Sequence, residues 1–339
     1  MLDDAIRLQM RFDVEGCLFL SGGVDSSVLA AHLRHQWNRD KVRAYSLDTV
    51  EEGFGEFHLA ERVGREMGID ITPVQYDHNI VPDTIADVLF HNDQPHGDFS
   101  FFLTRALCQR AHDDGVIVAF NGDGPDEILS GFGHNASFFA KHANGPFPVS
   151  EYFEMIAYMG SDARQSLLTS EFREKMGNPA DLFQSFLDPW SDLDPVEQIT
   201  AYETTVLAPG NNLIKTDRMG AGKSIEGRSP FMDHRISEAF ARMPAHQKQK
   251  DGTGKFFLKN YGLRHFDRDL MFRGKSMPTM PIGEWIKDPL KDWAQDTLRK
   301  LDPARYNVPA VLEMLDAHQK GTANHTRELR TLLMAGAWL

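Results

Sequence analysis

The sequence predicts an α/β protein built on a doubly wound, mainly parallel sheet. Short β-rich runs alternate with amphipathic helical stretches over the first third of the chain, and a glycine-rich turn joins the first run to the first such stretch. The strand signal fades beyond about residue 134. Alternation of this kind is typical of parallel strands, because each parallel pair needs a crossover connection that is usually a helix.

The strands and helices of the first region follow one another in a regular order. Four short apolar runs are expected to be strands: residues 17–20, 42–47, 71–76 and 116–120. Four stretches between them have apolar residues at spacings of three and four, which predicts helices at 26–37, 57–67, 83–90 and 101–112. This order predicts helices on both faces of the sheet.

The remainder of the chain is expected to be mostly helical. Three segments with helical periodicity are separated by Pro, Gly and Asp: residues 150–159, 180–186 and 195–207. We therefore expect an α/β core over residues 1–145 and a mostly helical region over 146–339 that completes the ligand pocket, both within one continuous domain.

Composition narrows the class of protein. With 339 residues, 41% of them hydrophobic and 25% charged, the chain is typical of a soluble globular protein. No apolar run is long enough to span a bilayer, and the first residues do not form a signal peptide, so we expect a cytoplasmic protein without a membrane partner. A net charge of −13 disfavours nucleic acid as a partner. Cys17 and Cys108 are too few for a disulfide framework or a cysteine zinc site.

A glycine loop follows the first predicted strand directly. The strand runs into Ser21-Gly22-Gly23-Val24-Asp25-Ser26-Ser27, after which the apolar-periodic helix continues. Adjacent glycines allow backbone angles closed to other residues, and they let amide N–H groups approach a ligand at the positive end of the helix. The pattern predicts that an anion binds in this loop.

The loop differs chemically from a Walker loop. No lysine occurs between Gly16 and Leu33, so the cation that a Walker lysine supplies to phosphates is missing. The carboxylate of Asp25 would repel a triphosphate unless a cation lay between them, and Mg²⁺ binds carboxylate and phosphate oxygens together. The loop therefore predicts a magnesium-bound nucleotide. The structural alternative is that Asp25 or Ser26 only caps the helix.

A second polar turn follows the fourth predicted strand. Residues 116–120 run into Asn121-Gly122-Asp123-Gly124-Pro125-Asp126-Glu127. Ligands of α/β sheets bind outside the carboxyl ends of the strands, so this turn is expected to meet the glycine loop and bring three carboxylates near Asp25. A divalent ion, or a carboxylate with a raised pKa that transfers protons, would make such a cluster tolerable. The alternative is an ordinary helix N-terminus rich in acidic residues.

Both turns resemble motifs of one enzyme family. SGGVDSS resembles the pyrophosphate loop of the N-type ATP pyrophosphatases, which include asparagine, β-lactam and GMP synthetases and tRNA-modifying enzymes. NGDGPDEILSGF resembles the acidic segment of asparagine synthetases, and the two motifs occur in the expected order. The likeness continues to about residue 290 through DQPHGD at 93–98, NNLIKTDRM at 211–219, SIEGRSPFMDH at 224–234, KFFLK at 255–259, and RGK with PIGEW at 273–285.

The resemblance implies a fold, cofactors and site residues. The fold is a five-stranded sheet of the adenine nucleotide alpha hydrolase-like type, and the cofactors are ATP and Mg²⁺. It places Asp25 and Asp126 on the metal. The residues that would bind ATP and its pyrophosphate are Ser21, Gly22, Gly23, Ser26, Ser27, Leu20, Leu47, Gly122 and Lys275.

Two residues receive catalytic roles. Lys275, in the RGK segment, corresponds to a late lysine that the family places on the phosphates, where it would offset charge that develops as pyrophosphate departs. Asp123 lies where asparagine synthetases carry an acidic residue, and we expect it to help deprotonate the attacking amine. Five other charged residues are expected to form structural ion pairs instead: Lys215, Asp217, Arg218, Glu226 and Arg228.

The implied reaction joins a carboxylate to an amine. A small-molecule carboxylate is adenylated with release of pyrophosphate, and the acyl group passes to ammonia or an amine with release of AMP. Because the glycine loop begins at residue 21, we expect the chain to lack the N-terminal glutaminase domain of glutamine-dependent asparagine synthetases. The nitrogen source is expected to be ammonia from a separate glutaminase, free ammonia or an organic amine. The protein is also expected to act in specialised metabolism, either as a homo-oligomer or with a separate glutaminase.

Other readings of the sequence predict different features. A tRNA-modifying ATP pyrophosphatase should be basic and often carries catalytic or zinc cysteines, which this acidic chain lacks. A catalytically silent nucleotide-binding protein should have lost Asp25, Asp123, Asp126 and Lys275, which are all present. A metal site at His91, Asp93, His96 and Asp98 has no supporting motif, so a polar loop is expected there.

Overall fold

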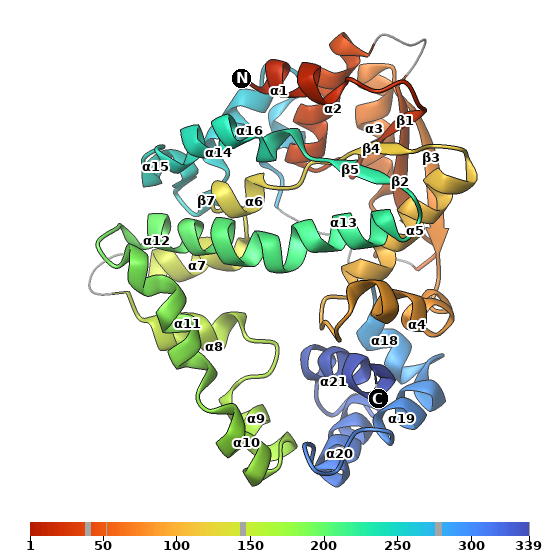
Figure 1. The fold of residues 1–339 in the computed structure, drawn as a ribbon, viewed down its shortest axis with the longest axis vertical. Coiled ribbons are helices and arrows are strands. Elements are labelled where there is room, and N and C mark those ends of the chain that lie inside the picture. Colours follow the sequence, from red (N-terminus) through yellow and green to blue (C-terminus); the bar gives the residue numbers. More distant parts are fainter. Residues whose placement is uncertain (38–41, 52, 143–146, 275–279, 339) are drawn as a thin grey trace. The chain divides into compact units, whose positions relative to one another are not determined.

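The protein is described by a computed structural model that covers residues 1–37, 42–51, 53–142, 147–274 and 280–338 (Figure 1). Its contacts group the chain into two compact units. The sheet unit combines Met1–Gln75, Thr104–Phe147 and Phe186–Pro278. The helical unit combines Tyr76–Leu103, Pro148–Ser185 and Thr279–Leu339. The division into 1–145 and 146–339 stays a prediction about domains, since each unit draws on separate stretches of chain.

The sheet has five strands in the order β3-β2-β1-β4-β5. Their bounds are β1 Gly16–Phe19, β2 Arg43–Thr49, β3 Asp70–Tyr76, β4 Val118–Phe120 and β5 Glu226–Arg228. The register pairs Leu18 with Ala44 on one side and with Phe120 on the other, both in parallel. The predicted doubly wound, parallel α/β fold is therefore confirmed.

Helices of the sheet unit surround this sheet and extend from it. Those before β5 are α1 Leu2–Gln9, α2 Val24–Gln36, α3 Phe57–Met67, α5 Ser100–Asp113 (which begins in the helical unit), α6 Pro125–Ile128, α7 Gly133–Lys141, η1 Asp188–Trp190, α12 Pro195–Tyr202, η2 Glu203–Asn212 and α13 Leu213–Ala221. Those after β5 are η3 Pro230–Met232, α14 His234–Ala241, α15 Ala245–Lys248, α16 Phe256–Gly262 and α17 Arg268–Phe272, with a hairpin of β6 Gln249–Lys250 and β7 Thr253–Gly254.

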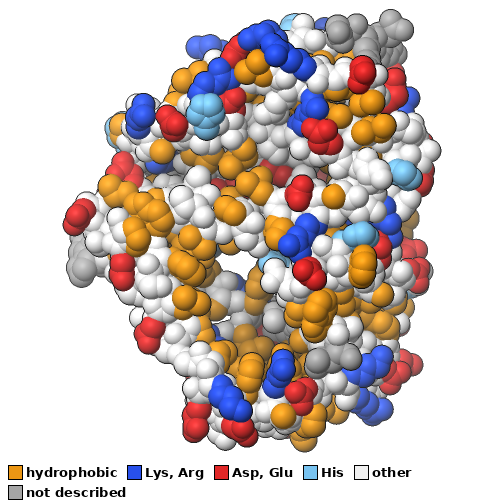
Figure 2. Space-filling view, viewed as in Figure 1, with side chains coloured by type: hydrophobic (Ala, Val, Ile, Leu, Met, Phe, Trp, Pro, Cys, Tyr) orange, Lys and Arg blue, Asp and Glu red, His pale blue; other side chains and the backbone are white. Residues whose placement is uncertain are grey.

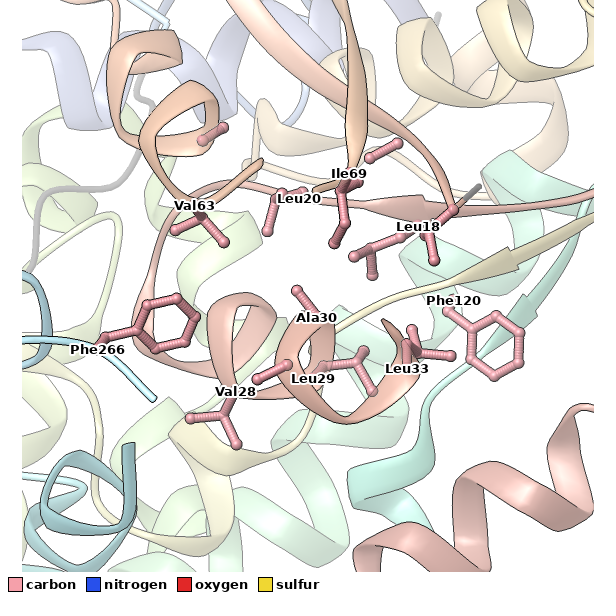
Figure 3. Packing of buried hydrophobic residues seen from close by; sticks show 14 of the residues in the cluster. Leu18, Leu20, Val28, Leu29, Ala30, Leu33, Val63, Ile69, Phe120 and Phe266 are labelled. Atoms are coloured by element: carbon pink, nitrogen blue, oxygen red, sulfur yellow. The ribbon is translucent and has the colours of Figure 1, made fainter. Parts of the chain in front are cut away.

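Two apolar clusters lie on opposite faces of the sheet because successive strand residues point to opposite sides. Leu18, Leu20 and Phe120 pack with Val28 and Leu29 of α2 on one face (Figure 3). Burial of each large aliphatic side chain contributes roughly 1.5–3 kcal/mol. This core fixes α2, and therefore the loop that precedes it.

The second cluster covers the other face of the sheet. It contains Cys17 of β1, Tyr45 of β2, Ala119 of β4 and Cys108 of α5. Both cysteines are free thiols, and burial raises the pKa of each, that of Cys108 to about 12. A buried thiol with a raised pKa is a poor nucleophile, so both cysteines act as packing residues here.

The helical unit has its own core. Its helices are α4 Ile80–Asn92, α8 Val149–Ile156, α9 Ser161–Leu167, α10 Ser170–Met176, α11 Pro179–Leu187 (which ends in the sheet unit), α18 Ile282–Lys287, α19 Lys291–Leu298, α20 Val308–Gln319 and α21 Thr326–Trp338. Trp285 and Leu332 are buried there, and Nε2 of buried His318 lies 2.8 Å from the carbonyl oxygen of Gly283. None of the described helices of the protein is long and apolar enough to cross a bilayer.

Two elements depart from the sequence-based expectation. The edge strand β5 lies in the range expected to be mostly helical, and its residues, Glu-Gly-Arg, have low strand propensity. Beyond α12 the chain continues as the ten-residue π-helix η2, whereas the periodicity predicted a helix that ends at 207. π-Helices usually occur as single turns and often at functional sites.

The surface agrees with the mixed charge of the composition. Figure 2 shows acidic and basic side chains interspersed with apolar ones on the visible face.

Candidate functional site

The glycine loop connects β1 to α2 through a strained turn. Gly22 has a φ of +72°, and a Cβ atom there would lie 2.6 Å from the carbonyl carbon of Leu59. The two hydroxyls of Ser21 and Ser26 lie 3.1 Å apart, and the Ser26 Oγ donates to the carbonyl oxygen of Gly23 at 3.3 Å. These contacts hold the backbone amides of the loop at the N-terminus of α2.

The acidic turn meets this loop, as the sequence predicted. A Cβ atom on Gly122 would lie 2.9 Å from the backbone nitrogen of Ser26 and 3.2 Å from the Cβ of Asp25. Only glycine allows this approach. The carboxyl ends of the neighbouring strands β1 and β4 therefore bring their two turns into direct contact.

A buried lysine bridges the two turns. The Nζ of Lys255 lies 2.8 Å from Asp126 Oδ1 and also hydrogen-bonds Asp25 Oδ2. Lys255 is only 3% exposed. Burial alone would lower the pKa of Lys255, but the carboxylates of Asp126 and Asp25 outweigh burial and raise it, so the lysine remains charged.

The backbone conformation around Lys255 directs its side chain toward Asp25 and Asp126. Lys255 adopts the left-handed region with a φ of +52°, and its backbone N–H donates to the Leu129 carbonyl oxygen at 2.9 Å. A Cβ on Gly131 would lie 2.1 Å from Lys255 Cε and 2.3 Å from Asp126 Oδ1. A Cβ on Gly254 would lie 2.1 Å from the Ser130 carbonyl oxygen. Residues larger than glycine at positions 131 and 254 would therefore collide with the segments that position Lys255.

Asp123 lies in the same turn with defined partners. Its backbone N–H donates to Asn121 Oδ1 at 3.1 Å, and its Oδ2 accepts a hydrogen bond of 2.6 Å from Thr216 Oγ1. Burial raises the pKa of Asp123, and the charge of Lys215 and the hydrogen bond from Thr216 oppose that rise. A raised pKa makes this carboxylate a stronger base than an ordinary aspartate.

Glu127 is the most deeply buried carboxyl of the turn. It is 1% exposed, and Asn212 Nδ2 donates to its Oε1. Burial raises the pKa of Glu127 to about 7, and the charge of Asp126 adds to the rise. A large fraction of Glu127 is therefore protonated at neutral pH.

The other predicted residues are distributed around this centre. Ser21 is exposed, whereas Ser26 and Ser27 are buried. Leu20 follows β1 and is 1% exposed, and Leu47 is partly buried within β2. Lys275 lies outside the described residues. Among the residues expected to form ion pairs, Arg228 Nε lies 2.9 Å from Glu226 Oε1, and Lys215 Nζ donates to Asn212 Oδ1 at 3.2 Å.

Sequence reasoning missed Lys255 as a site residue. Its KFFLK segment was noted only as a family likeness, and the missing loop lysine was assigned to Lys275. The signal that points to Lys255 is the Thr-Gly-Lys turn at 253–255, where glycine precedes a lysine at a helix start. Its partners lie 230 and 129 positions earlier, so sequence spacing does not reveal them.

The carboxylates of Asp25 and Asp126 could bind a divalent ion together with phosphate oxygens. Asp25 and Asp126 converge on one cationic atom, which shows that both carboxylates reach a common point. Mg²⁺ is usually bound by one or two carboxylates together with phosphate oxygens and water. Within the described ranges, no group of three His, Cys, Asp or Glu side chains could hold a metal by itself.

The second candidate metal cluster is divided between helix α4, which contains His91, and the segment after it, which contains Asp93, His96 and Asp98. His91 Nε2 lies 3.3 Å from Asp87 Oδ1, and His96 Nδ1 accepts a hydrogen bond of 3.1 Å from the backbone of Asp98. The expected polar loop therefore holds for the residues after α4 but not for His91, which lies in the helix.

A parallel sheet with a glycine loop and an acidic turn at adjacent strand ends defines an α/β protein of the nucleotide-binding type. The family described as Asparagine synthase matches residues 1–339, and the chain belongs to this family.

Relatives of the chain include glutamine-hydrolysing enzymes. It is 21% identical to "Asparagine synthetase [glutamine-hydrolyzing] 1" of Bacillus subtilis, in a match that covers 99% of this chain and 57% of the relative. It is 24% identical to a "Putative asparagine synthetase [glutamine-hydrolyzing]" of Mycobacterium tuberculosis, over 100% of this chain and 56% of the relative. It is 27% identical to "Amidase chyE" of Penicillium rubens, over 38% of this chain and 21% of the relative. The chain thus spans little more than half the length of the asparagine synthetases that it matches.

Proposed function

We propose that this protein is an ATP-dependent carbon–nitrogen ligase that forms an amide. It adenylates a substrate carboxylate with release of pyrophosphate, and it transfers the acyl group to ammonia or an amine with release of AMP. The observation that carries the proposal is the convergence of Asp25 and Asp126 on Lys255, directly beside the glycine loop. Membership of the asparagine synthase family supports the same chemistry.

The glycine loop is proposed to bind the phosphates. Backbone amides at the start of α2 and the hydroxyls of Ser21 and Ser26 are donors suited to phosphate oxygens. Gly22, Gly23 and Ser27 complete the proposed pyrophosphate site, and Leu20, Leu47 and Gly122 the proposed nucleotide site. Lys255 supplies a cation that the loop itself lacks, and Lys275 is proposed as a second one.

Asp25 and Asp126 would hold Mg²⁺, which would neutralise charge on the phosphates. The protein's own contribution is to bring both carboxylates to one point and to keep Lys255 charged beside them. This arrangement stabilises negative charge as the bond between the α- and β-phosphates breaks.

Asp123 is proposed as the general base of the second step. The amine nitrogen attacks the acyl carbon, its proton passes to the Asp123 carboxylate, and the acyl C–O bond breaks with its electron pair leaving on AMP. The raised pKa of Asp123 supports this role, because it makes the carboxylate a stronger base than an ordinary aspartate.

Pyrophosphate release tests the proposed function. Purified protein is incubated with ATP and Mg²⁺ and a panel of carboxylic acids, with and without ammonia or amines. The proposal predicts AMP and pyrophosphate in amounts that depend on the carboxylate. Formation of ADP would contradict it, and release that depends on RNA would favour a tRNA-modifying enzyme.

The nitrogen source and the assembly are part of the proposal. Several relatives are named as glutamine-hydrolysing, so ammonia from a glutaminase is one candidate source, and an organic amine on a specialised metabolite is another. Addition of a separate glutaminase with glutamine to the same assay distinguishes the two. A homo-oligomer would appear as a mass above 38.3 kDa in light scattering.

A further inference from the structure

The junction of η2 and α13 presents two polar side chains to the acidic turn. Thr216 Oγ1 donates to Asp123 Oδ2 at 2.6 Å, and Asn212, at the junction of η2 and α13, donates to Glu127. The two donors are four positions apart, a spacing that places side chains on one face of a helix. One helical face therefore donates hydrogen bonds to two carboxyl groups of the acidic turn.

The π-helix η2 leads directly into α13 along that face. It ends at Asn212 and α13 begins at Leu213, so Asn212 lies at the end of the π-helix and Thr216 in the first turn of the α-helix. The edge strand β5 leaves room for the Thr216 side chain because it has glycine at position 227. A Cβ on Gly227 would lie 2.9 Å from Thr216 Cγ2, so a larger residue on β5 would displace the threonine.

The bond from Thr216 occupies one of the two carboxylate oxygens of Asp123. Thr216 is 8% exposed, so water competes little for its hydroxyl. The hydroxyl donor fixes the rotation of the carboxylate about its side-chain bond. Among the described residues no hydrogen bond to Oδ1 is found, so this oxygen could accept a proton from a substrate.

We propose that Thr216 is a positioning residue for the amide-forming step, because it orients the Asp123 carboxylate toward the attacking amine. This inference rests on the proposed function and adds a residue to it. In the step concerned, the C–N bond forms as the amine proton passes to Asp123 Oδ1, and the acyl–phosphate C–O bond breaks with AMP as the leaving group. Adenylation precedes this transfer and does not need Asp123 as a base, so Thr216 should act on the second step alone.

The test separates the two steps in Thr216→Val, Thr216→Ser and the control Thr204→Val. Valine keeps the shape of threonine and removes the hydroxyl, whereas serine keeps the hydroxyl. Thr204 also lies in the helical segment, but its hydroxyl donates to the Thr200 carbonyl oxygen, away from Asp123. Carboxylate-dependent ATP–pyrophosphate exchange reports adenylation. Hydroxamate formation, with hydroxylamine as the amine and the best acid of the panel, reports acyl transfer.

We expect Thr216→Val to keep the exchange rate within about twofold and to lower the kcat for hydroxamate formation by about 10- to 100-fold, the range for a misplaced catalytic group. Thr216→Ser should restore most of the lost rate, and Thr204→Val should behave as wild type. Equal loss of both activities in Thr216→Val, no loss of transfer, or no rescue by serine would each overturn the inference. Wild-type protein without carboxylate-dependent exchange would overturn the proposed function, and this inference with it.

Discussion

The two turns at the carboxyl ends of β1 and β4 lie side by side but are built in different ways. The glycine loop is held by its own residues, since Ser21, Gly23 and Ser26 hydrogen-bond one another within six positions. The acidic turn depends on distant chain, because Asp123, Asp126 and Glu127 have partners at 216, 255 and 212. The hydroxyls of the loop are therefore positioned by local hydrogen bonds, whereas the three neighbouring carboxyls of the acidic turn have partners from elsewhere in the fold.

The two turns also differ in charge. The loop has one carboxylate, Asp25, and the acidic turn has three. Lys255 is the cation that the structure places between them. Substitutions at Asp25 in the loop and at Asp126 in the acidic turn should therefore act on the proposed metal and phosphate site. Substitutions at Asp123 and Glu127 should act on proton transfer and on stability.

The largest effect is expected from Asp25→Asn in the loop. Loss of the Asp25 charge removes a proposed metal ligand. Because a bound metal ion contributes several kcal/mol of transition-state stabilisation, carboxylate-dependent pyrophosphate release should fall by roughly 1000-fold. Asp269→Asn, an exposed carboxylate on α17, is the control and should retain full activity. An Asp25→Asn variant with wild-type turnover would remove the argument for a metal in this loop.

Lys255→Met should unfold more easily because two carboxylates then lose their buried cation. Removing one partner of a buried ion pair costs about 3–5 kcal/mol of unfolding free energy, measurable by urea denaturation. Mg²⁺ should restore more stability to this variant than to wild type, since it would occupy the position of the missing charge.

Lys250→Met is the matched control for that experiment, because Lys250 is exposed. It should change the unfolding free energy by less than about 0.5 kcal/mol. If Lys255→Met were as stable as wild type without Mg²⁺, Lys255 would not be the counter-ion of the two turns.

Glu127 should make stability depend on pH. Burial raises its pKa from 4.5 to about 7, so between these values the folded protein binds more protons than the unfolded chain. The contribution of Glu127 is then fully present below about pH 4.5 and is lost as the pH rises to about 7, by roughly 3 kcal/mol. Urea denaturation at a series of pH values, compared between wild type and Glu127→Gln, isolates this contribution. Parallel pH profiles for the two proteins would show that Glu127 titrates normally.

The smallest effect is expected from Gly131→Ala. The new methyl group would collide with Lys255 Cε and Asp126 Oδ1, and such overpacking costs about 1–3 kcal/mol. Gly133→Ala, two positions away, has no heavy atom within 4 Å of its new Cβ and should be nearly neutral. Thermal denaturation of both variants checks the difference, and equal melting temperatures would contradict the close packing at Gly131.

The two turns also show how much the sequence could predict. The strands, the crossover helices and the glycine loop follow from local patterns, because β1 and α2 carry their apolar periodicity and glycines in one continuous segment. The convergence of Gly122 with Asp25 followed from the general rule about strand ends. The roles of Lys255 and Thr216 could not be predicted, since their contacts depend on tertiary packing over long sequence separations. The π-helix η2 and the strand β5 were missed because neither has a distinctive local composition.

A crystal structure with Mg²⁺ and an ATP analogue that resists cleavage tests whether the two turns form one nucleotide site. We expect phosphates at the Ser21–Ser27 loop and a metal ion in contact with both Asp25 and Asp126. A nucleotide bound elsewhere, or Asp25 and Asp126 too far apart to share a metal ion, would contradict this expectation.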